Sequence, residues 1–343
     1  MLNKVPLPQA INYFWNFRSI VGFAYTVQLI SRIILSLRYY ARTITESFNS
    51  IETIVREVEY GYIIRRFHLV GSQAILLTIY LHITRSIYYR RRANTPITLQ
   101  RAVILLVTIR AAFLRYVLPW GQISFWRATV ITRFLRVLPN RPSILEWVWR
   151  GFTVGHPTLT RFFSLHYLLG LAIIPLSLIH VLLLHEKRSG RPLRDTRDFY
   201  IPFWPYFAIK DLWPIILLIA FMLSLVLFLI PETENLKYAD PIVTPIHIKP
   251  EWYFLIFYAI LRAVPSKVGG LLLILIAIVI LVVVLYAGNI HSISPVISNV
   301  AIIFFTICII LTVLRRKPVE EPFLSTSIVM TILYFFFRLL LTI

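Results

Sequence analysis

The sequence predicts an all-α membrane protein with eight transmembrane helices. Of its 343 residues, 58% are hydrophobic and only 15% are charged. Soluble domains are about 45–50% apolar, and the mean hydropathy of the chain is high, at +0.75. A lipid bilayer is therefore the solvent that this composition suits.

Three stretches without a charged side chain predict the clearest spans, at residues 212–230, 270–288 and 296–314. Each is close to the roughly 20 residues that a helix needs to cross the hydrocarbon layer. Five further stretches are apolar but less pure, at 17–39, 61–89, 98–118, 163–184 and 322–342. The order of these stretches predicts eight helices.

Charge in the connections predicts the orientation in the membrane. The second and fourth connections are basic, with Arg90, Arg91 and Arg92 in one and Lys187, Arg188, Arg191, Arg194 and Arg197 in the other. The first connection is acidic, with Glu46, Glu52, Glu57 and Glu59. Because basic loops stay inside, the even-numbered connections are expected to face the inner compartment. The third connection does not follow this rule, since it contains Arg133, Arg136, Arg141 and Arg150.

The single cysteine and the scattered charges exclude other classes. Cys308 alone cannot form an internal disulfide framework or a thiolate metal cluster. The formal net charge is +20, but the basic residues are spread through apolar segments. We therefore expect membrane lipids and no nucleic acid as partners.

Two domains are predicted, at residues 1–205 and 206–343.

Four of the eight histidines form two equally spaced pairs inside predicted spans. His68 and His82 are fourteen residues apart, and so are His166 and His180. Fourteen residues make nearly four helical turns, so each pair lies on one helix face, about 21 Å apart along the axis. Two such helices side by side supply two axial imidazoles at each of two levels, which predicts two b-type haems in an N-terminal four-helix bundle.

Each histidine taken alone is explained as well by a hydrogen bond to a neighbouring helix, and only the repeated spacing favours haem ligation. Arg65 and Arg85 lie three residues from His68 and His82, respectively. At that spacing a guanidinium can pair with a haem propionate. From the residues alone, snorkelling toward the membrane surface explains both arginines equally well.

Several segments read together resemble mitochondrial cytochrome b, the haem subunit of the cytochrome bc1 complex (complex III). They are GYIIRRFH, LHITRSIYY, VLPWGQISFW, TLTRFFSLHY, FYIPFWPYFAIKDL and TPIHIKPEWYFLIFYAILRAVPSK, and they span nearly the whole chain. The equal spacing in both helices, with all eight helices in one chain, resembles the mitochondrial type more than the split chloroplast b6 type.

This resemblance implies a subunit of ubiquinol:cytochrome c oxidoreductase that oxidises ubiquinol on the outer side and reduces ubiquinone on the inner side. Its two haems then connect the two sites, with His68 and His166 at the outer haem and His82 and His180 at the inner one. This coupling drives proton translocation in the mitochondrial inner membrane.

The resemblance also implies the residues of the two quinone sites. The outer site is expected at Pro250, Glu251, Trp252, Tyr253 and Tyr258, where a carboxylate accepts the quinol proton and a phenol holds the ring oxygen. Without the resemblance, the first four residues are a helix start in an interfacial aromatic belt. The inner site is expected at His185, Ser189, Lys210 and Asp211, which are otherwise a solvated, charged helix end.

One departure from the family pattern concerns glycines that let the porphyrins lie against the backbone. Those positions are Arg18 and Arg32, then Arg101 and Arg115, and both pairs are again fourteen apart. Further arginines replace family glycines at Arg127, Arg150 and Arg188. A guanidinium at the bilayer centre costs at least about 2.5 kcal/mol on insertion scales. We hypothesise that the source organelle decodes an arginine codon as glycine or serine; rearranged haem packing in a divergent protein is the alternative.

Partners and rival functions follow from the same residues. Without cysteine pairs the chain cannot hold an iron–sulfur cluster or attach haem through a CxxCH motif. The resemblance therefore implies a Rieske iron–sulfur protein, cytochrome c1 and accessory subunits in a dimeric complex. Two alternatives stay open: a haem-bearing membrane anchor of another quinone-linked dehydrogenase, and a non-haem proton or ion transporter.

Overall fold

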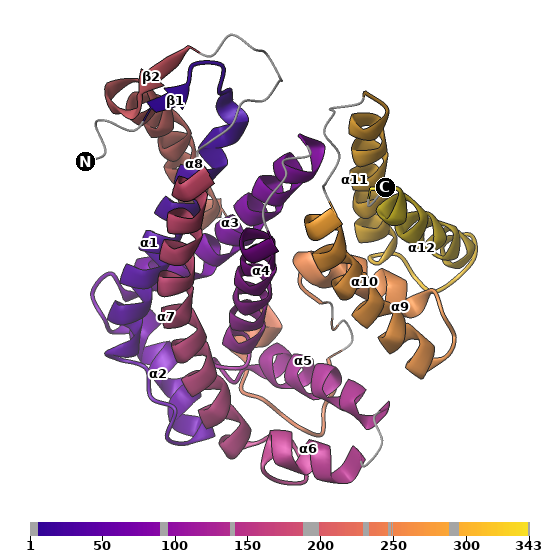
Figure 1. The fold of residues 1–343 in the computed structure, drawn as a ribbon. Helices are drawn as coiled ribbons and strands as arrows, with labels where there is room; N and C mark the ends of the chain where they lie inside the picture. Colours follow the sequence, from indigo (N-terminus) through magenta and orange to yellow (C-terminus); the bar gives the residue numbers. More distant parts are fainter. Residues whose placement is uncertain are drawn as a thin grey trace. The chain divides into compact units, whose positions relative to one another are not determined.

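The computed structural model describes residues 6–89, 95–137, 141–187, 199–228, 233–245, 248, 250–287 and 295–341, which are almost entirely helical (Figure 1). Its α-helices are α1 (Phe17–Ser36), α2 (Ile44–Arg56), α3 (Gly61–Tyr88), α4 (Thr95–Arg115), α5 (Gln122–Arg133), α6 (Arg141–Trp149), α7 (His156–Lys187), α8 (Ala208–Phe228), α9 (Leu255–Arg262), α10 (Lys267–Ala287), α11 (Pro295–Leu314) and α12 (Phe323–Leu340). Two short strands, β1 (Pro6–Pro8) and β2 (Tyr200–Pro202), pair antiparallel.

These helices confirm the all-α membrane class. Each of the eight predicted spans coincides with a helix: α1, α3, α4, α7, α8, α10, α11 and α12. Six helical stretches are long and apolar enough to cross a membrane, and they coincide with all or most of α1, α3, α4, α7, α8 and α12. Two shorter apolar stretches, Lys267–Ile280 in α10 and Ser298–Leu314 in α11, do not reach that length. The count of eight spans therefore stays a prediction.

The chain forms two compact units, which are described separately. The first comprises residues 1–83, 104–129 and 146–245, and the second comprises 84–103, 130–145 and 246–343. Both units contain segments that are distant in the sequence. The predicted domain boundary at residue 205 stays a prediction.

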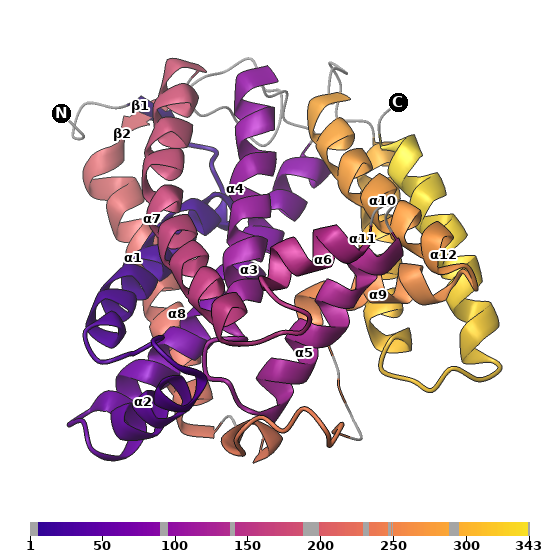
Figure 2. The ribbon, with the colours of Figure 1, turned by 90° about the horizontal axis from the view of Figure 1, so that it is seen from below.

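Small residues allow the helices of each unit to pack closely. In the first unit, Ala24 on α1 and Ala74 on α3 have no exposed surface, and α1 packs against α8. In the second unit, Ala259, Ala277 and Ala301 are equally buried where α9, α10, α11 and α12 meet (Figure 2). Small residues at helix contacts are typical of membrane proteins, because lipid supplies no hydrophobic force that drives helices together.

Large apolar side chains remain exposed on the long helices of the first unit. Leu168, Leu178 and Leu182 on α7 and Trp213 on α8 are more than half exposed. These faces are suited to lipid or to a neighbouring subunit.

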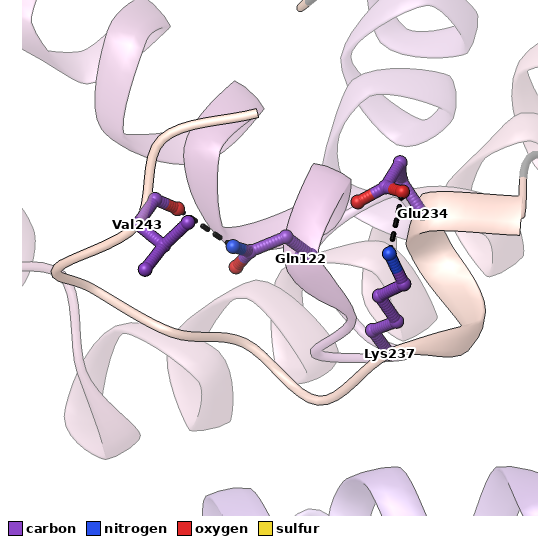
Figure 3. Close-up of polar contacts among 4 residues, drawn as sticks. All are labelled: Gln122, Glu234, Lys237 and Val243. Carbon is purple, nitrogen blue, oxygen red and sulfur yellow. Dashed lines mark hydrogen bonds and ion pairs between the residues drawn. The ribbon is translucent and has the colours of Figure 1, made fainter. Parts of the chain in front are cut away.

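The segment after α8 folds back onto the start of α5. The Gln122 side chain donates to the Val243 carbonyl (2.6 Å) and accepts from the Asp240 amide (2.8 Å), and Lys237 pairs with Glu234 at 2.7 Å (Figure 3). A Cβ on Gly121 would lie 2.3 Å from the Asn235 carbonyl oxygen. Glycine is therefore required where these two backbones meet.

Candidate functional site

His68 on α3 and His166 on α7 face each other inside the first unit. Their ring centroids are 6.3 Å apart, and the ring planes are perpendicular. A metal–imidazole bond is about 2.0–2.1 Å long. Two imidazoles that share one metal ion therefore have centroids roughly 6 Å apart, and this pair fits that arrangement.

Hydrogen bonds to the other ring nitrogen orient both imidazoles. Nδ1 of His166 lies 2.8 Å from the Ala111 carbonyl oxygen, so Nδ1 must carry the proton. Nδ1 of His68 lies 2.9 Å from Ser31 Oγ, and that hydroxyl already donates to the Val27 carbonyl at 2.8 Å. The hydroxyl has one hydrogen, so it accepts from His68. Nε2 is then the nitrogen with a lone pair in both rings, as metal ligation requires.

A second side chain of α1 reaches the same turn of α3. The Gln28 side chain donates to the His68 backbone carbonyl at 2.8 Å. A Cβ on Gly71 would lie 2.3 Å from Nε2 of Gln28. Gly71 thus lets Gln28 lie against the α3 backbone. Neither Gln28 nor Ser31 was predicted, because a buried amide or hydroxyl in a membrane span has no sequence signal that tells which helix it contacts.

Two arginines lie at the level of this histidine pair. The guanidinium of Arg32 donates to the Tyr167 carbonyl at 3.0 Å, and its Nη1 would be 2.3 Å from a Cβ on Gly170. The guanidinium of Arg115 donates to the Leu69 carbonyl at 3.2 Å. Both guanidinium groups are close enough to act electrostatically on His68 and on His166. The spacing of the two imidazoles therefore fits a shared haem iron, whereas the two guanidinium groups place positive charge beside them.

The second pair, His82 and His180, lies on the same two helices, fourteen residues further along each. Both residues are partly buried. Arg65, one turn before His68, is also partly buried and interacts favourably with the charge of Glu52. Arg85 is partly buried near the end of α3. The helices thus carry the predicted ligands at the predicted spacing.

The residues expected at the inner quinone site are only partly brought together. Lys210 donates to the Ile11 carbonyl, and its backbone carbonyl accepts from Asn16 at 2.7 Å. Asp211 is buried and interacts with the charge of Arg18. His185 is exposed near the end of α7. Ser189 and Arg188 lie outside the described residues. The contact of Asn16 and Arg18 with the start of α8 was not predicted.

The residues expected at the outer quinol site lie in the second unit. Glu251 precedes a 3₁₀ turn, Trp252–Phe254, and α9 follows directly. Tyr253 is buried, with 1% of its surface exposed. The Tyr258 ring packs edge-on against the Phe134 ring, with 6.1 Å between the two ring centroids. The Arg315 guanidinium lies 5.6 Å from the centre of the Tyr258 ring. Pro250, Glu251, Trp252 and Tyr258 are all partly exposed.

Fold and site together define a multi-pass helical membrane protein with facing histidines between two of its long helices. Comparison with known proteins makes this more specific. The family profile "Cytochrome b/b6/petB" matches residues 2–188, and "Cytochrome b(C-terminal)/b6/petD" matches residues 238–335. The chain therefore belongs to the cytochrome b family, as its motifs predicted.

Individual relatives cover nearly the full chain. Cytochrome b of Albinaria caerulea is 43% identical over 98% of this chain and 95% of its own length. Cytochrome b of Acanthamoeba castellanii is 40% identical over 97% of this chain and 89% of its own. A chain of a solved "Hyperthermophilic respiratory Complex III" has a TM-score of 0.90 and 25% identity, and the match covers 99% of this chain and 93% of that one.

Membership in this family assigns two properties to the chain. It binds b-type haem, and it transfers electrons across the membrane in which its helices lie. The two rival functions, a transporter and a different dehydrogenase anchor, are not favoured by any of these comparisons.

Proposed function

We propose that each histidine pair holds one b-type haem, with His68 and His166 on the outer side and His82 and His180 on the inner side. The observation that carries this proposal is the close approach of the His68 and His166 rings, whose centroids are 6.3 Å apart, with Nδ1 of each ring held by Ser31 or Ala111. Haem held by these four histidines would supply one-electron transfer.

The chain is an electron-transfer subunit of a bc1-type complex, the ubiquinol:cytochrome c oxidoreductase. Its relatives and its fold together place it in a multisubunit respiratory assembly. We propose a Rieske iron–sulfur protein, cytochrome c1 and accessory subunits as partners, in a dimeric complex. Since a single cysteine cannot hold an iron–sulfur cluster, that centre must come from another chain.

For quinol oxidation we propose Glu251 as the proton acceptor and Tyr258 as the hydrogen-bonding phenol. Glu251 has a partly exposed side chain at the start of a helical segment, where it can both meet a quinol and release a proton. Pro250, Trp252 and Tyr253 shape the backbone around it. The buried ring of Tyr253 fixes this turn in the second unit.

For quinone reduction we propose His185, Ser189, Lys210 and Asp211. Lys210 and Asp211 open α8 beside the start of α1, and His185 lies exposed near the end of α7. An ammonium, an imidazole and a carboxyl group can supply the two protons that a reduced quinone takes up. We propose the mitochondrial inner membrane as the location, since the motifs resemble the mitochondrial type.

A haem count tests the ligand assignment. The purified complex is expected to show two b-type haems per chain in its reduced-minus-oxidised spectrum. His166→Leu and His180→Leu are each expected to lose one haem, whereas His156→Leu, which changes an exposed histidine at the start of α7, keeps both. A complex whose b-type band is unchanged in His166→Leu would refute the assignment.

A further inference from the structure

We infer that the positions written as arginine in this sequence are of two kinds. Some hold true arginines, whereas Arg32, Arg115 and Arg338 are small residues in the protein that the organelle makes. One of the two arginine codon families would then be decoded there as glycine or serine. For Arg32 and Arg115 the inference rests in part on the proposed haem site. For Arg338 it does not.

Arg32 is buried, with 7% of its surface exposed, in a helix that is long and apolar enough to cross the membrane. Among the described residues, its Nε and Nη2 have no hydrogen-bond partner. Its Nη1 donates to the Tyr167 carbonyl, and the guanidinium lies 4.5 Å from the centre of the Tyr167 ring. In the part of the chain that the structure describes, no carboxylate acts on this guanidinium. A buried charge without a counter-charge or a full set of hydrogen bonds is among the least favourable arrangements in a membrane.

Arg115 approaches the same histidine pair from α4. It is 8% exposed, and its guanidinium contacts the Leu69 carbonyl and Ser72 Oγ on α3, one residue and four residues after His68. Its charge acts on His68 and on His166 together with that of Arg32. A small residue at each position removes two positive charges from the ligands and opens the space beside them.

Arg338 is in a similar situation in the second unit, which contains none of the proposed haem ligands. It is 1% exposed on α12, and its Nε and Nη2 have no hydrogen-bond partner among the residues that the structure describes. Tyr334 and Cys308 are the side chains that interact electrostatically with its guanidinium. The guanidinium lies 4.9 Å from the centre of the Phe304 ring. Within the described residues, no acidic side chain compensates this buried charge either.

Two other arginines have more partners than Arg32 and Arg338: Arg56 has an ion pair, and both Nη groups of Arg262 are hydrogen-bonded, although its Nε has no partner among the described residues. Arg56 is exposed and forms an ion pair with Glu52 at 2.8 Å. Arg262 donates to the Lys317 carbonyl at 2.9 Å and to the Leu314 carbonyl at 3.2 Å, at the end of α11. A cation at a helix C-terminus is favourable, because the last carbonyls have no partner within the helix. These two residues are expected to be true arginines and serve as matched controls.

The backbone at Arg150 agrees with this division. This residue directly follows α6 and has a φ of 54°, in the left-handed region that glycine adopts most readily. Glycine is the usual residue directly after a helix in this conformation. Tyr60 and Trp120 share the conformation, so Arg150 supports the inference without carrying it.

Peptide sequencing of the native protein tests the inference. The complex is purified from its own organelle, digested with chymotrypsin, which does not depend on arginine, and sequenced by tandem mass spectrometry. We expect glycine or serine at positions 32, 115 and 338, and arginine at positions 56 and 262. The codons at the first three positions should also belong to a different family from those at the two controls.

Two outcomes would overturn the inference. One is arginine at positions 32 and 338. The other is a small residue at 56 or 262, because the structure would then fail to separate the two kinds of position. The haem spectrum of the same preparation is recorded separately, so failure of the proposed haem site is distinguished from failure of the decoding.

Discussion

At the scale of single residues, the hydroxyl of Ser31 is the clearest addition to the ligands. It accepts from Nδ1 of His68 while donating to a helix carbonyl, so it fixes the tautomer that leaves Nε2 available. Ala111 does the same for His166 through its backbone carbonyl. Such partners of a ligating histidine raise its basicity and hold its orientation. A hydroxyl partner can be removed by mutation, whereas a carbonyl cannot.

Ser31→Ala is expected to raise the midpoint potential of one b-type haem and leave the other unchanged. Without an acceptor for its Nδ1–H, His68 donates less electron density and stabilises the oxidised iron less. Redox titration of the purified complex measures this. Ser36→Ala is the matched control, since Ser36 also donates to a carbonyl of α1, that of Ile33. If the unmodified protein, Ser31→Ala and Ser36→Ala had equal haem midpoint potentials, the role of Ser31 would be contradicted.

Glu251→Gln is expected to slow ubiquinol oxidation by roughly a hundredfold or more, the usual effect of removing a general base. Glutamine keeps the shape of the side chain but cannot take up the proton. Both haems should keep their spectra, because Glu251 is not one of the four proposed haem ligands. Steady-state reduction of cytochrome c is the measurement, with Glu320→Gln, an exposed carboxylate, as the control. A normal rate in Glu251→Gln would exclude the proton-acceptor role.

The four histidines could be predicted from the sequence, while the residues that hold them could not. The equal spacing of fourteen residues can be read from the sequence, because the regular rise and turn of a helix fix where two residues of known spacing lie on it. Ser31 is 37 residues from His68, and Ala111 is 55 residues from His166. Such contacts depend on how helices pack. Other serines on α1, such as Ser19 and Ser36, show no different local pattern.

At the scale of elements, apolar composition predicted the spanning helices well and the remaining helices poorly. Helix α8, expected at 212–230, runs from Ala208 to Phe228. Helix α7 begins at His156, seven residues before its predicted span, because the intervening polar residues belong to the helix but not to the apolar stretch. Helices α2, α5 and α6 lie in predicted connections, since their sequences lack a long apolar run.

Gly121→Ala is expected to destabilise the first unit by about 1–3 kcal/mol, the usual cost of forcing an extra group into a packed site. The added Cβ would lie 2.3 Å from the Asn235 carbonyl oxygen, in a segment that the Gln122 side chain holds through hydrogen bonds to Asp240 and Val243. Thermal unfolding of the purified complex measures the change. Gly22→Ala, with no atom within 4 Å of the new Cβ, should be neutral or slightly stabilising. Equal losses in both variants would contradict the backbone contact.

At the scale of the whole molecule, the proposed arrangement makes the order of the haems across the membrane testable. His68 and His166 lie nearer the acidic first connection, and His82 and His180 lie nearer the basic connections. Since basic loops face the inner compartment, the second pair should serve the inner quinone site. Electrons from ubiquinol can then enter the haems by two routes, one from each side.

His180→Leu is expected to abolish haem reduction through the inner site and to preserve reduction of the remaining haem through the outer site. Removing the inner ligand interrupts the inner route alone, because His68 and His166 keep their own orienting partners on Ser31 and Ala111. Rapid-mixing spectroscopy with ubiquinol, with an inhibitor of either site present in turn, separates the two routes. His156→Leu should retain both. If His180→Leu instead lost the outer route, the two pairs would be assigned to the wrong sides, and the orientation deduced from the loop charges would be reversed.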